Sequence, residues 1–246
     1  MKKVIEIKNL SYAYPDGKTA LENISLDIYE GESIGIVGPN GAGKTTLILH
    51  LNGILRGNCQ LKILDMEMNG KNLKNIRSKV GLVFQNPEDQ LFSPTVFEDV
   101  SFGPLNMRLP AEEVRKRTEE ALAQVEMEGF ENKSSHHLSE GEKKRVSIAT
   151  VFSMKPKVVV LDEPTSNLDP KHRRELIDLL KKFKTTMIIV SHDLEAVLEL
   201  CERTVLVNKG KIVKDGQTAE IMKNEKLMES NSLECPLSIK YRQNKN

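Results

Sequence analysis

Short runs of apolar, mostly β-branched residues recur along the chain. The first two runs alternate apolar with polar positions, as half-buried strands do. The later runs are nearly continuous, as in parallel strands that are covered on both faces. The pattern predicts strands at residues 4–7, 24–28, 33–37, 80–84, 158–161, 186–190 and 204–207.

Apolar residues at helical spacing lie between these runs. Leu47, Ile48 and Leu51 form one such stripe after Lys44, and Pro110 stands early in another segment, where helices tolerate proline. Strands that alternate with helices indicate a parallel α/β sheet. We expect helices at residues 44–54, 110–127, 140–153 and 170–180.

The strand pattern is interrupted in the middle of the chain, where turn-forming residues come first and helical spacing follows. We therefore expect a helical subdomain at about 86–153, inserted in a single domain that covers residues 4–224. The stretch 225–246 is polar and has little periodicity. Its few apolar residues leave two alternatives for this tail, a role in dimerisation or disorder.

Composition excludes several classes of protein. Lys and Arg number 36 against 35 Asp and Glu, so a net charge of +1 would not draw the chain onto nucleic acid or anionic lipid. No apolar run approaches the roughly 20 residues of a membrane helix, and residues 1–20 lack the apolar core of a secretory signal. Cys59, Cys201 and Cys235 are widely spaced, which suits a reducing compartment. The sequence predicts a cytosolic chain that binds no nucleic acid.

A glycine-rich segment follows the strand at 33–37 directly and precedes the helix from Lys44, which is the context that the phosphate-loop pattern G-x-x-x-x-G-K-[ST] requires. Its glycines let backbone N–H groups curl around a phosphate, and the helix points its positive end at the same anion. Lys44 would reach the β- and γ-phosphates, and the Thr45 hydroxyl would bind Mg²⁺. The predicted nucleotide-binding residues here are Gly38, Pro39, Asn40, Gly41, Ala42, Gly43, Lys44, Thr45 and Thr46.

Two acids and a histidine stand at the ends of later strands. Asp162 is placed to hold the Mg²⁺ that Thr45 approaches, and Glu163 to polarise an attacking water. For an isolated pair of acids, capping of the turn before Pro164 would be the simpler interpretation, but a phosphate loop favours the catalytic one. A lone histidine at a strand end is usually structural, so His192 gains its weight from these neighbours.

The segment from Leu138 to Arg145, Leu-Ser-Glu-Gly-Glu-Lys-Lys-Arg, resembles the signature segment of ABC-type ATPases. Locally, Ser139 and Glu142 form a capping box that starts a helix and needs no ligand. A Ser and a Gly at a helix N-terminus also form an anion site. The resemblance implies that Ser139 and Gly141 complete the ATP site of a second chain, so that two chains enclose two nucleotides.

The resemblance covers roughly residues 4–220. It implies a P-loop NTPase (RecA-like) α/β core with an N-terminal antiparallel β subdomain and the inserted helical subdomain. It also implies hydrolysis of ATP with Mg²⁺ as the second cofactor.

Further roles come from the same resemblance. Tyr14 matches the aromatic residue on which adenine stacks, with Tyr12 as the neighbouring alternative. Gln85 matches the glutamine that contacts Mg²⁺ and water and reports to the membrane partner. The implied catalytic residues are Glu163 as general base, His192 as the switch histidine, Lys44 and Gln85. The implied metal ligands are Thr45, Gln85 and Asp162. The loop from Ser166 to Asp169 would cross the dimer interface, with Asp169 at the nucleotide.

The signature departs from the family pattern at two positions, because Glu140 and Glu142 replace the usual Gly and Gln. Two carboxylates beside a phosphate site would weaken it by repulsion. We expect the cations at 143–145 to offset this, and the composite site to function through Ser139 and Gly141. Asn167, in place of a small residue, is a milder change.

The stretch from Asn86 to Pro104 resembles the ATPases of energy-coupling factor importers, which include cobalt, nickel and vitamin uptake systems. In that group a groove behind the glutamine receives a coupling helix from a transmembrane subunit, and Leu91, Phe92 and Phe97 would belong to this groove. The alternative interpretation is that these three residues pack in the core of the helical subdomain.

The partners that this group implies are a second ATPase subunit, as a homodimer or a paralogue heterodimer, a transmembrane coupling subunit and a separate substrate-binding membrane subunit. The chain would lie peripherally on the cytoplasmic face of the cell membrane. The alternatives are an ATPase of another ABC transporter class, or a soluble ABC ATPase of the iron–sulfur assembly type.

Overall fold

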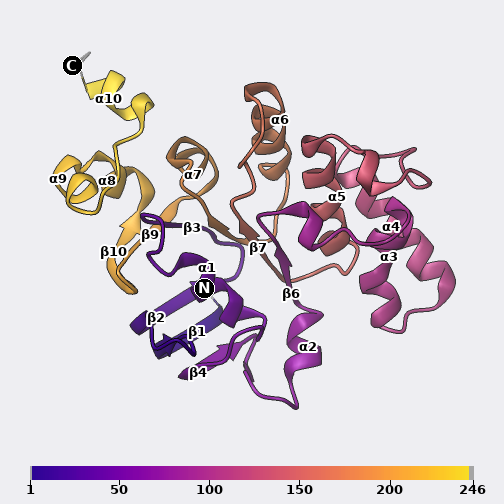
Figure 1. The fold of residues 1–246 in the computed structure, drawn as a ribbon, viewed down its shortest axis with the longest axis horizontal. Helices are drawn as coiled ribbons and strands as arrows, with labels where there is room; N and C mark the ends of the chain where they lie inside the picture. The colour runs from indigo at the N-terminus through magenta and orange to yellow at the C-terminus, as the bar shows by residue number, and fades with distance from the viewer. Residues whose placement is uncertain (1, 244–246) are drawn as a thin grey trace.

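The computed structural model describes residues 2–243 and contains two β-sheets with helices packed against them (Figure 1). The larger sheet has the strand order β10-β9-β3-β8-β7-β6. Its strands pair in parallel except β10, which runs antiparallel to β9 at one edge. They are β3 (Ser33–Val37), β6 (Val80–Val83), β7 (Val158–Asp162), β8 (Thr186–Val190), β9 (Arg203–Asn208) and β10 (Lys211–Gln217).

The smaller sheet is antiparallel and has the order β2-β1-β4-β5. Its strands are β1 (Lys3–Ala13), β2 (Thr19–Tyr29), β4 (Asn58–Ile63) and β5 (Met66–Glu67). The expected antiparallel N-terminal subdomain is therefore confirmed. β4, β5 and β10 were not predicted, because none of them has a continuous apolar run.

Helices pack around the two sheets, and two of them connect consecutive parallel strands of the larger one, β7 to β8 and β8 to β9. α1 ends at Leu51 and not at Ile54 as expected, because Gly53 takes a left-handed φ of 67° and ends the helical run. These helices are α1 (Lys44–Leu51), α2 (Leu73–Arg77), α6 (Pro170–Leu180), α7 (Leu194–Leu200), α8 (Thr218–Lys223), α9 (Glu225–Ser230) and α10 (Leu237–Gln243).

Both faces of the larger sheet are buried. In β7, Val159 and Leu161 pack into the hydrophobic core that includes residues of α6 and α7, whereas Val158 and Val160 pack into the core shared with β1, β2 and α1. All four side chains are 0% exposed. This two-sided burial is the physical reason for the continuous apolar runs, and the parallel α/β prediction is confirmed.

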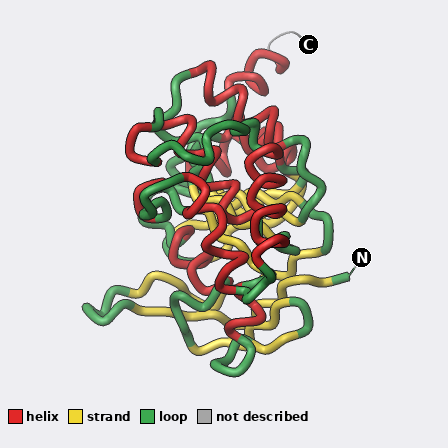
Figure 2. The backbone as a smooth tube through the Cα atoms, turned by 90° about the vertical axis from the view of Figure 1, so that its right-hand side faces the viewer, coloured by secondary structure: helices red, strands yellow, loops and turns green. Residues whose placement is uncertain are grey.

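A helical region lies between β6 and β7 at one side of the molecule (Figure 1). Three helices that pack on one another form it, with short 3₁₀ turns between them. They are α3 (Val96–Asn106), α4 (Ala111–Gln124) and α5 (Glu140–Phe152), and the turns are η1 (Pro87–Asp89) and η2 (Ser135–His137). In the tube view most helices lie in the upper part of the molecule and the small sheet lies at the bottom (Figure 2).

Phe97 lies in α3, in a stretch where no helix was expected from the sequence. The Thr95 hydroxyl accepts from the Glu98 N–H at 3.2 Å and the Glu98 carboxylate accepts from the Thr95 N–H at 3.1 Å, which is a complete capping box. The spacing Thr-x-x-Glu in the sequence would have predicted this helix.

The tail is helical over its described part, in α9 and α10. Met228 is fully buried and Leu227 and Leu233 pack beside it, whereas Leu237 is 63% exposed. Ser238 anchors α10 by donating its N–H and its hydroxyl to the Glu195 carboxylate. Within residues 2–243, no helix is long and apolar enough to cross a bilayer.

Candidate functional site

The candidate site lies where the neighbouring strands β3, β8 and β7 end. Their carboxyl ends lead into the glycine-rich loop, into Ser191 and His192, and into Glu163, and ligands of open α/β sheets bind at such edges. A cavity of about 640 Å³ opens there. Its lining residues are Tyr14, Asp16, Lys18, Thr19, Ala20, Asn40, Gly41, Ala42, Gly43, Lys44, Thr45, Thr46, Gln85, Glu163 and His192.

The glycine-rich loop has a backbone that other residues would not tolerate. Gly38 and Gly43 have φ values of 155° and 102°, and a Cβ on them would lie 2.0 Å from the Val207 carbonyl and 2.5 Å from the Ala20 carbonyl. Gly43 is also the N-cap of α1, and no side chain caps this helix. The N–H groups of its first turn therefore remain available for an anion.

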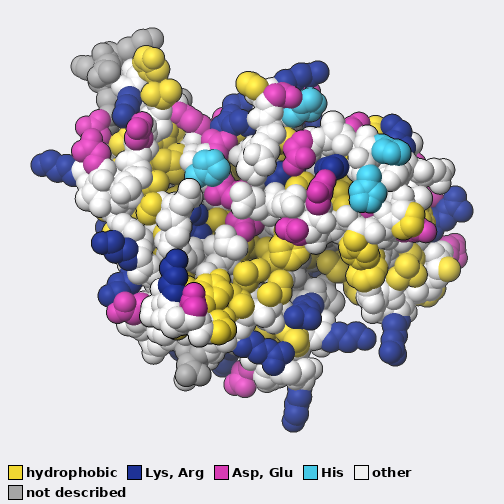
Figure 3. All heavy atoms as spheres, in the orientation of Figure 1, with side chains coloured by type: hydrophobic (Ala, Val, Ile, Leu, Met, Phe, Trp, Pro, Cys, Tyr) yellow, Lys and Arg dark blue, Asp and Glu magenta, His cyan; other side chains and the backbone are white. Residues whose placement is uncertain are grey.

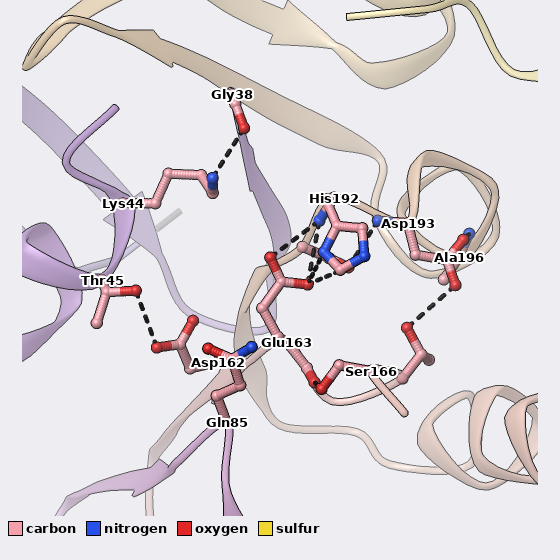
Figure 4. A network of polar contacts seen from close by, with 12 residues as sticks. Gly38, Lys44, Thr45, Gln85, Asp162, Glu163, Ser166, His192, Asp193 and Ala196 are labelled. Carbon is pink, nitrogen blue, oxygen red and sulfur yellow. Dashed lines mark hydrogen bonds and ion pairs between the residues drawn. The ribbon is translucent and has the colours of Figure 1, made fainter. Parts of the chain in front are cut away.

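Lys44 reaches back over the loop, where its ammonium donates to the Gly38 carbonyl at 2.8 Å and to the Pro39 carbonyl at 3.1 Å (Figure 4). Burial lowers the pKa of Lys44, and the charges of Glu163 and Asp162 partly counteract this. The lysine is thus held at the loop beside two acids, where a phosphate would compete for it.

Asp162 and Thr45 form a contact that fits a hard divalent cation. Thr45 Oγ1 donates to Asp162 Oδ2 at 3.1 Å, and Asp162 Oδ1 is buried without a hydrogen-bond partner among residues 2–243. Burial raises the pKa of Asp162, because the charged carboxylate is poorly solvated there. Gln85 extends toward the acids in Figure 4, and its side-chain amide offers a further oxygen ligand. Oxygen ligands of this kind suit Mg²⁺.

These three residues do not make a full coordination shell by themselves. Among the described residues no group of three or more His, Cys, Asp and Glu side chains could hold a metal ion. Mg²⁺ usually keeps waters and is bound by few protein ligands together with substrate phosphates, which agrees with such a partial donor set.

Glu163 is held from several sides (Figure 4). Its carboxylate accepts from the His192 N–H at 3.1 Å and from the Ser191 hydroxyl at 3.2 Å, and it is only 7% exposed. Its backbone has a φ of 47°, a left-handed conformation that costs a residue with a side chain ~1–3 kcal/mol. Strained backbone of this kind is common at functional sites.

The structure distinguishes the two candidate aromatic residues. Tyr14 lines the cavity and its hydroxyl lies 3.0 Å from the Thr46 hydroxyl. Tyr12 does not line it and instead packs edge-on against Tyr14 and against the buried His50, with ring centroids 5.2 and 4.9 Å apart. Tyr12 therefore supports the ring of Tyr14 from behind.

Five predicted ATP-binding residues do not line this cavity: Gly38 and Pro39, whose carbonyls accept from Lys44 within the loop, and Ser139, Gly141 and Asp169. Ser139 and Gly141 begin α5, and the Asp169 carboxylate caps α6 by accepting from the Lys171 N–H at 2.9 Å. His172 links them, because it contacts Asp169 and because a Cβ on Gly141 would lie 3.1 Å from its ring. They form a second group of their own, separate from the phosphate loop of the same chain.

A family model described as ABC transporter matches residues 21–166. A Geobacter sulfurreducens protein that is named for its class, ABC transporter ATP-binding protein, is 51% identical over 96% of this chain and 95% of its own length. The energy-coupling factor transporter ATP-binding protein EcfA of Methanothermobacter thermautotrophicus is 47% identical over 95% of this chain and 77% of its own length. This chain belongs to the ABC transporter family.

Solved structures agree with this assignment. CbiO1 of Clostridium perfringens, described as part of the ABC transporter complex CbiONQ, superposes with a TM-score of 0.83 at 36% identity over 99% of this chain and 100% of its own. The ATP-binding cassette MJ0796, in a dimeric structure bound to ADP and Pi, gives 0.78 at 30% identity over 87% and 98%. The predicted fold class, an ABC ATPase, is confirmed, and as an ABC ATPase domain the chain binds ATP.

Two of the three cations after the signature segment of this ABC domain pair with other acids. Lys143 pairs with Glu88 at 2.8 Å and Arg145 pairs with Glu126 and Glu175, whereas the buried Lys144 interacts electrostatically with Glu140. The Glu142 carboxylate instead accepts the Ser139 N–H at 2.7 Å, which is the main cause of its lowered pKa. Nothing in the local sequence distinguished the inward lysine from its neighbours.

A second cavity of this ABC domain, about 1290 Å³, lies beside β6 and between α2 and α3. Phe92 and Phe102 line it, are 61% and 49% exposed, and pack edge-on with centroids 5.1 Å apart. Leu91 packs in the core and Phe97 is half-buried, whereas Phe92 is exposed in the cavity. Core packing therefore applies to Leu91, and the groove interpretation applies to Phe92. Figure 3 shows hydrophobic side chains over the helical region and Lys and Arg side chains around α2. We call this cavity the helical-subdomain groove.

Proposed function

We propose that this chain is the ATP-hydrolysing subunit of an energy-coupling factor type ABC importer. The observation that carries the catalytic part is the contact of Thr45 with Asp162, which leaves one buried carboxylate oxygen free of hydrogen bonds beside the phosphate loop. The Glu163–His192 pair lines the same cavity. The EcfA relatives support the importer class.

In this proposal ATP lies in the 640 Å³ cavity, with adenine on Tyr14 and the phosphates on the loop. The residues assigned to the nucleotide are Tyr14, Gly38, Pro39, Asn40, Gly41, Ala42, Gly43, Lys44, Thr45 and Thr46. Lys44 and His192 stabilise negative charge on the γ-phosphate, and Glu163 takes a proton from the attacking water that Gln85 helps to orient. Thr45, Gln85 and Asp162 would hold Mg²⁺, which supplies further charge stabilisation.

The composite site is assigned to two chains arranged head to tail. Ser139, Gly141 and Asp169 lie outside the cavity of their own chain, so they are available to a nucleotide on a partner. The dimeric structure of the MJ0796 cassette supports this arrangement. The partner is a second copy or a paralogue, and Glu142 keeps its place in the capping box while Ser139 and Gly141 contact the partner's ATP.

Coupling to transport is assigned to the helical-subdomain groove. Its exposed phenylalanines suit the apolar face of a helix from a transmembrane subunit, and Phe84, which lines it, directly precedes Gln85. The name of CbiO1, part of the complex CbiONQ, supports such partners. The proposal includes a separate substrate-binding membrane subunit and a peripheral place on the cytoplasmic face. It keeps residues 4–224 as one ATPase domain with the insertion at about 86–153, and 225–246 as a tail.

The test is co-expression of the tagged chain with the products of its neighbouring genes, followed by membrane fractionation and an ATPase assay. Recovery in the membrane fraction with an integral-membrane scaffold and a small membrane protein supports the importer. Recovery with a different set of membrane proteins favours another ABC transporter class. Active ATPase found only in a soluble complex would favour the iron–sulfur assembly type and overturn the proposal.

A further inference from the structure

Lys144 is a charged residue that the helix α5 directs into the protein. Its side chain is 1% exposed, although the neighbours Lys143 and Arg145 form ion pairs near the surface. Among the described residues no carboxylate lies within ion-pair distance of the Lys144 ammonium. A buried cation without such a pair is costly unless hydrogen bonds satisfy it.

Three oxygens from two loops, one after β6 and one between β7 and α6, satisfy this ammonium. It donates to the Gln85 carbonyl, to the Glu163 carbonyl at 3.3 Å and to the Ser166 hydroxyl at 3.2 Å. An ammonium has three N–H donors, so each donor has an acceptor. Helix α5 is thereby tied to the residues that follow β6 and β7 and to the loop that leads to α6.

The Glu163 carbonyl receives a second hydrogen bond, because the Ser166 hydroxyl donates to it at 2.8 Å. The Glu163 N–H donates to the Val190 carbonyl at 2.8 Å. Both backbone groups of a residue with a φ of 47° are therefore fixed by partners. A left-handed conformation of a residue with a side chain persists only where its surroundings hold it, and here Lys144 and Ser166 provide that hold.

We propose that Lys144 is a positioning residue for ATP hydrolysis: it keeps the Glu163 backbone left-handed and fixes the Gln85 carbonyl, so that both side chains face the nucleotide cavity. The inference rests on the proposed function of Glu163 and Gln85. It adds a link between the two nucleotides of the dimer, because Ser139 and Gly141 begin the same helix one turn earlier. A nucleotide on the partner would contact the start of α5, and Lys144 would transmit its position to the base of this chain.

The experiment compares Lys144→Met, which keeps the length and removes the donors, with Lys144→Gln, which keeps an amide donor. Lys155→Met, just after the same helix, is the matched control that removes only an exposed ion pair with Glu120. The readouts are kcat and KM for Mg·ATP, the Kd of a fluorescent ATP analogue, and thermal unfolding of the full chain. We expect kcat to fall at least 10-fold in Lys144→Met with a Kd within about 3-fold of wild type, a smaller loss in Lys144→Gln, and none in Lys155→Met.

Ser166→Ala tests the shared carbonyl. If Lys144 and Ser166 act on the same atom, the double variant loses less kcat than the product of the two single losses. The inference is overturned if correctly folded Lys144→Met keeps wild-type kcat, or if its loss appears only as weaker ATP binding. If Lys144→Met does not fold, a folded Lys144→Gln with wild-type kcat overturns it equally. If the wild-type protein itself shows no ATPase activity, the proposed function is wrong, and so is this inference, which rests on it.

Discussion

His192 and Glu163 contact each other twice in this structure. The His192 N–H donates to the Glu163 carboxylate at 3.1 Å, and His192 Nδ1 lies 2.7 Å from Glu163 Oε2. The His192 side chain is 63% exposed, whereas the Glu163 side chain beneath it is 9% exposed. The histidine therefore stands between the proposed general base and the open part of the nucleotide cavity, where both can act on the same phosphate.

Glu163→Gln keeps the size of the side chain and removes the base. We expect kcat for ATP hydrolysis to fall roughly 10²-fold or more, with ATP still bound, because general bases contribute on that order. Size-exclusion chromatography with ATP should show an accumulated dimer. Near-normal turnover in this variant would exclude Glu163 as the base.

Lys44→Ala removes the charged donor of the phosphate loop. A hydrogen bond from a charged group contributes ~1.5–3 kcal/mol, so the Kd for ATP should rise about 10- to 100-fold. Equilibrium binding of a fluorescent ATP analogue measures it, with Lys18→Ala as a control from the edge of the same cavity. An equal effect in both variants would argue for general electrostatics rather than a contact of Lys44.

Asp162→Asn tests the magnesium site. We expect the Mg²⁺ concentration for half-maximal ATPase activity to rise about 10-fold or more, because a hard cation loses a charged ligand. Burial raises the pKa of Asp162, and Mg²⁺ binds the ionised form, so wild-type affinity for Mg²⁺ should increase with pH as the carboxyl ionises. Magnesium titrations at several pH values should show this trend in the wild type and a weaker one in Asp162→Asn.

Phe92→Ser tests the helical-subdomain groove as a docking site. Buried aromatic anchors of interfaces often contribute ~2 kcal/mol or more, so recovery of membrane partners in a pull-down should fall at least about 10-fold. Leu105→Ser is the control, because Leu105 is 56% exposed in α3, the helix that carries Phe102, but does not line the groove. Equal losses in the two variants would place the contact outside the groove.

Glu199 is predicted to stabilise the fold in a pH-dependent way. Arg174 and Lys181 donate to its carboxylate and lower its pKa to about 2, from 4.5. Because the folded pKa is the lower one, the stabilisation is complete above about pH 5 and is lost as pH falls toward 2. Glu199→Gln should lower the free energy of unfolding by ~1–2 kcal/mol at pH 7 and by less at pH 4.

Urea denaturation at the two pH values measures this difference. Asp178→Asn is the control, since its carboxylate is 55% exposed and lies 3.8 and 3.9 Å from the same two cations. A surface pair of this kind contributes little, so its effect should stay within ~0.5 kcal/mol. A destabilisation by Glu199→Gln that does not change with pH would contradict the assignment.

The sequence by itself determined the features whose cause is local. The phosphate loop is contiguous, and the two glycines that its pattern requires, Gly38 and Gly43, both take positive φ values. The parallel strands of the larger sheet were predictable because burial on both faces demands continuous apolar residues, whereas the exposed antiparallel edge strand β10 lacks this pattern. The start of α5 followed from the capping box of Ser139 and Glu142, whose two hydrogen bonds span only three residues.

Only the tertiary structure decided what depends on residues far apart in the chain. Thr45 and Asp162 are 117 positions apart, and the contact between them arises because β3 and β7 end at one edge of the sheet. The inward direction of the Lys144 side chain, unlike that of Lys143, depends on acceptors in two loops that pack against α5. Periodicity places a side chain on a face of its helix, but what that face meets is set by packing between elements, which local sequence does not encode.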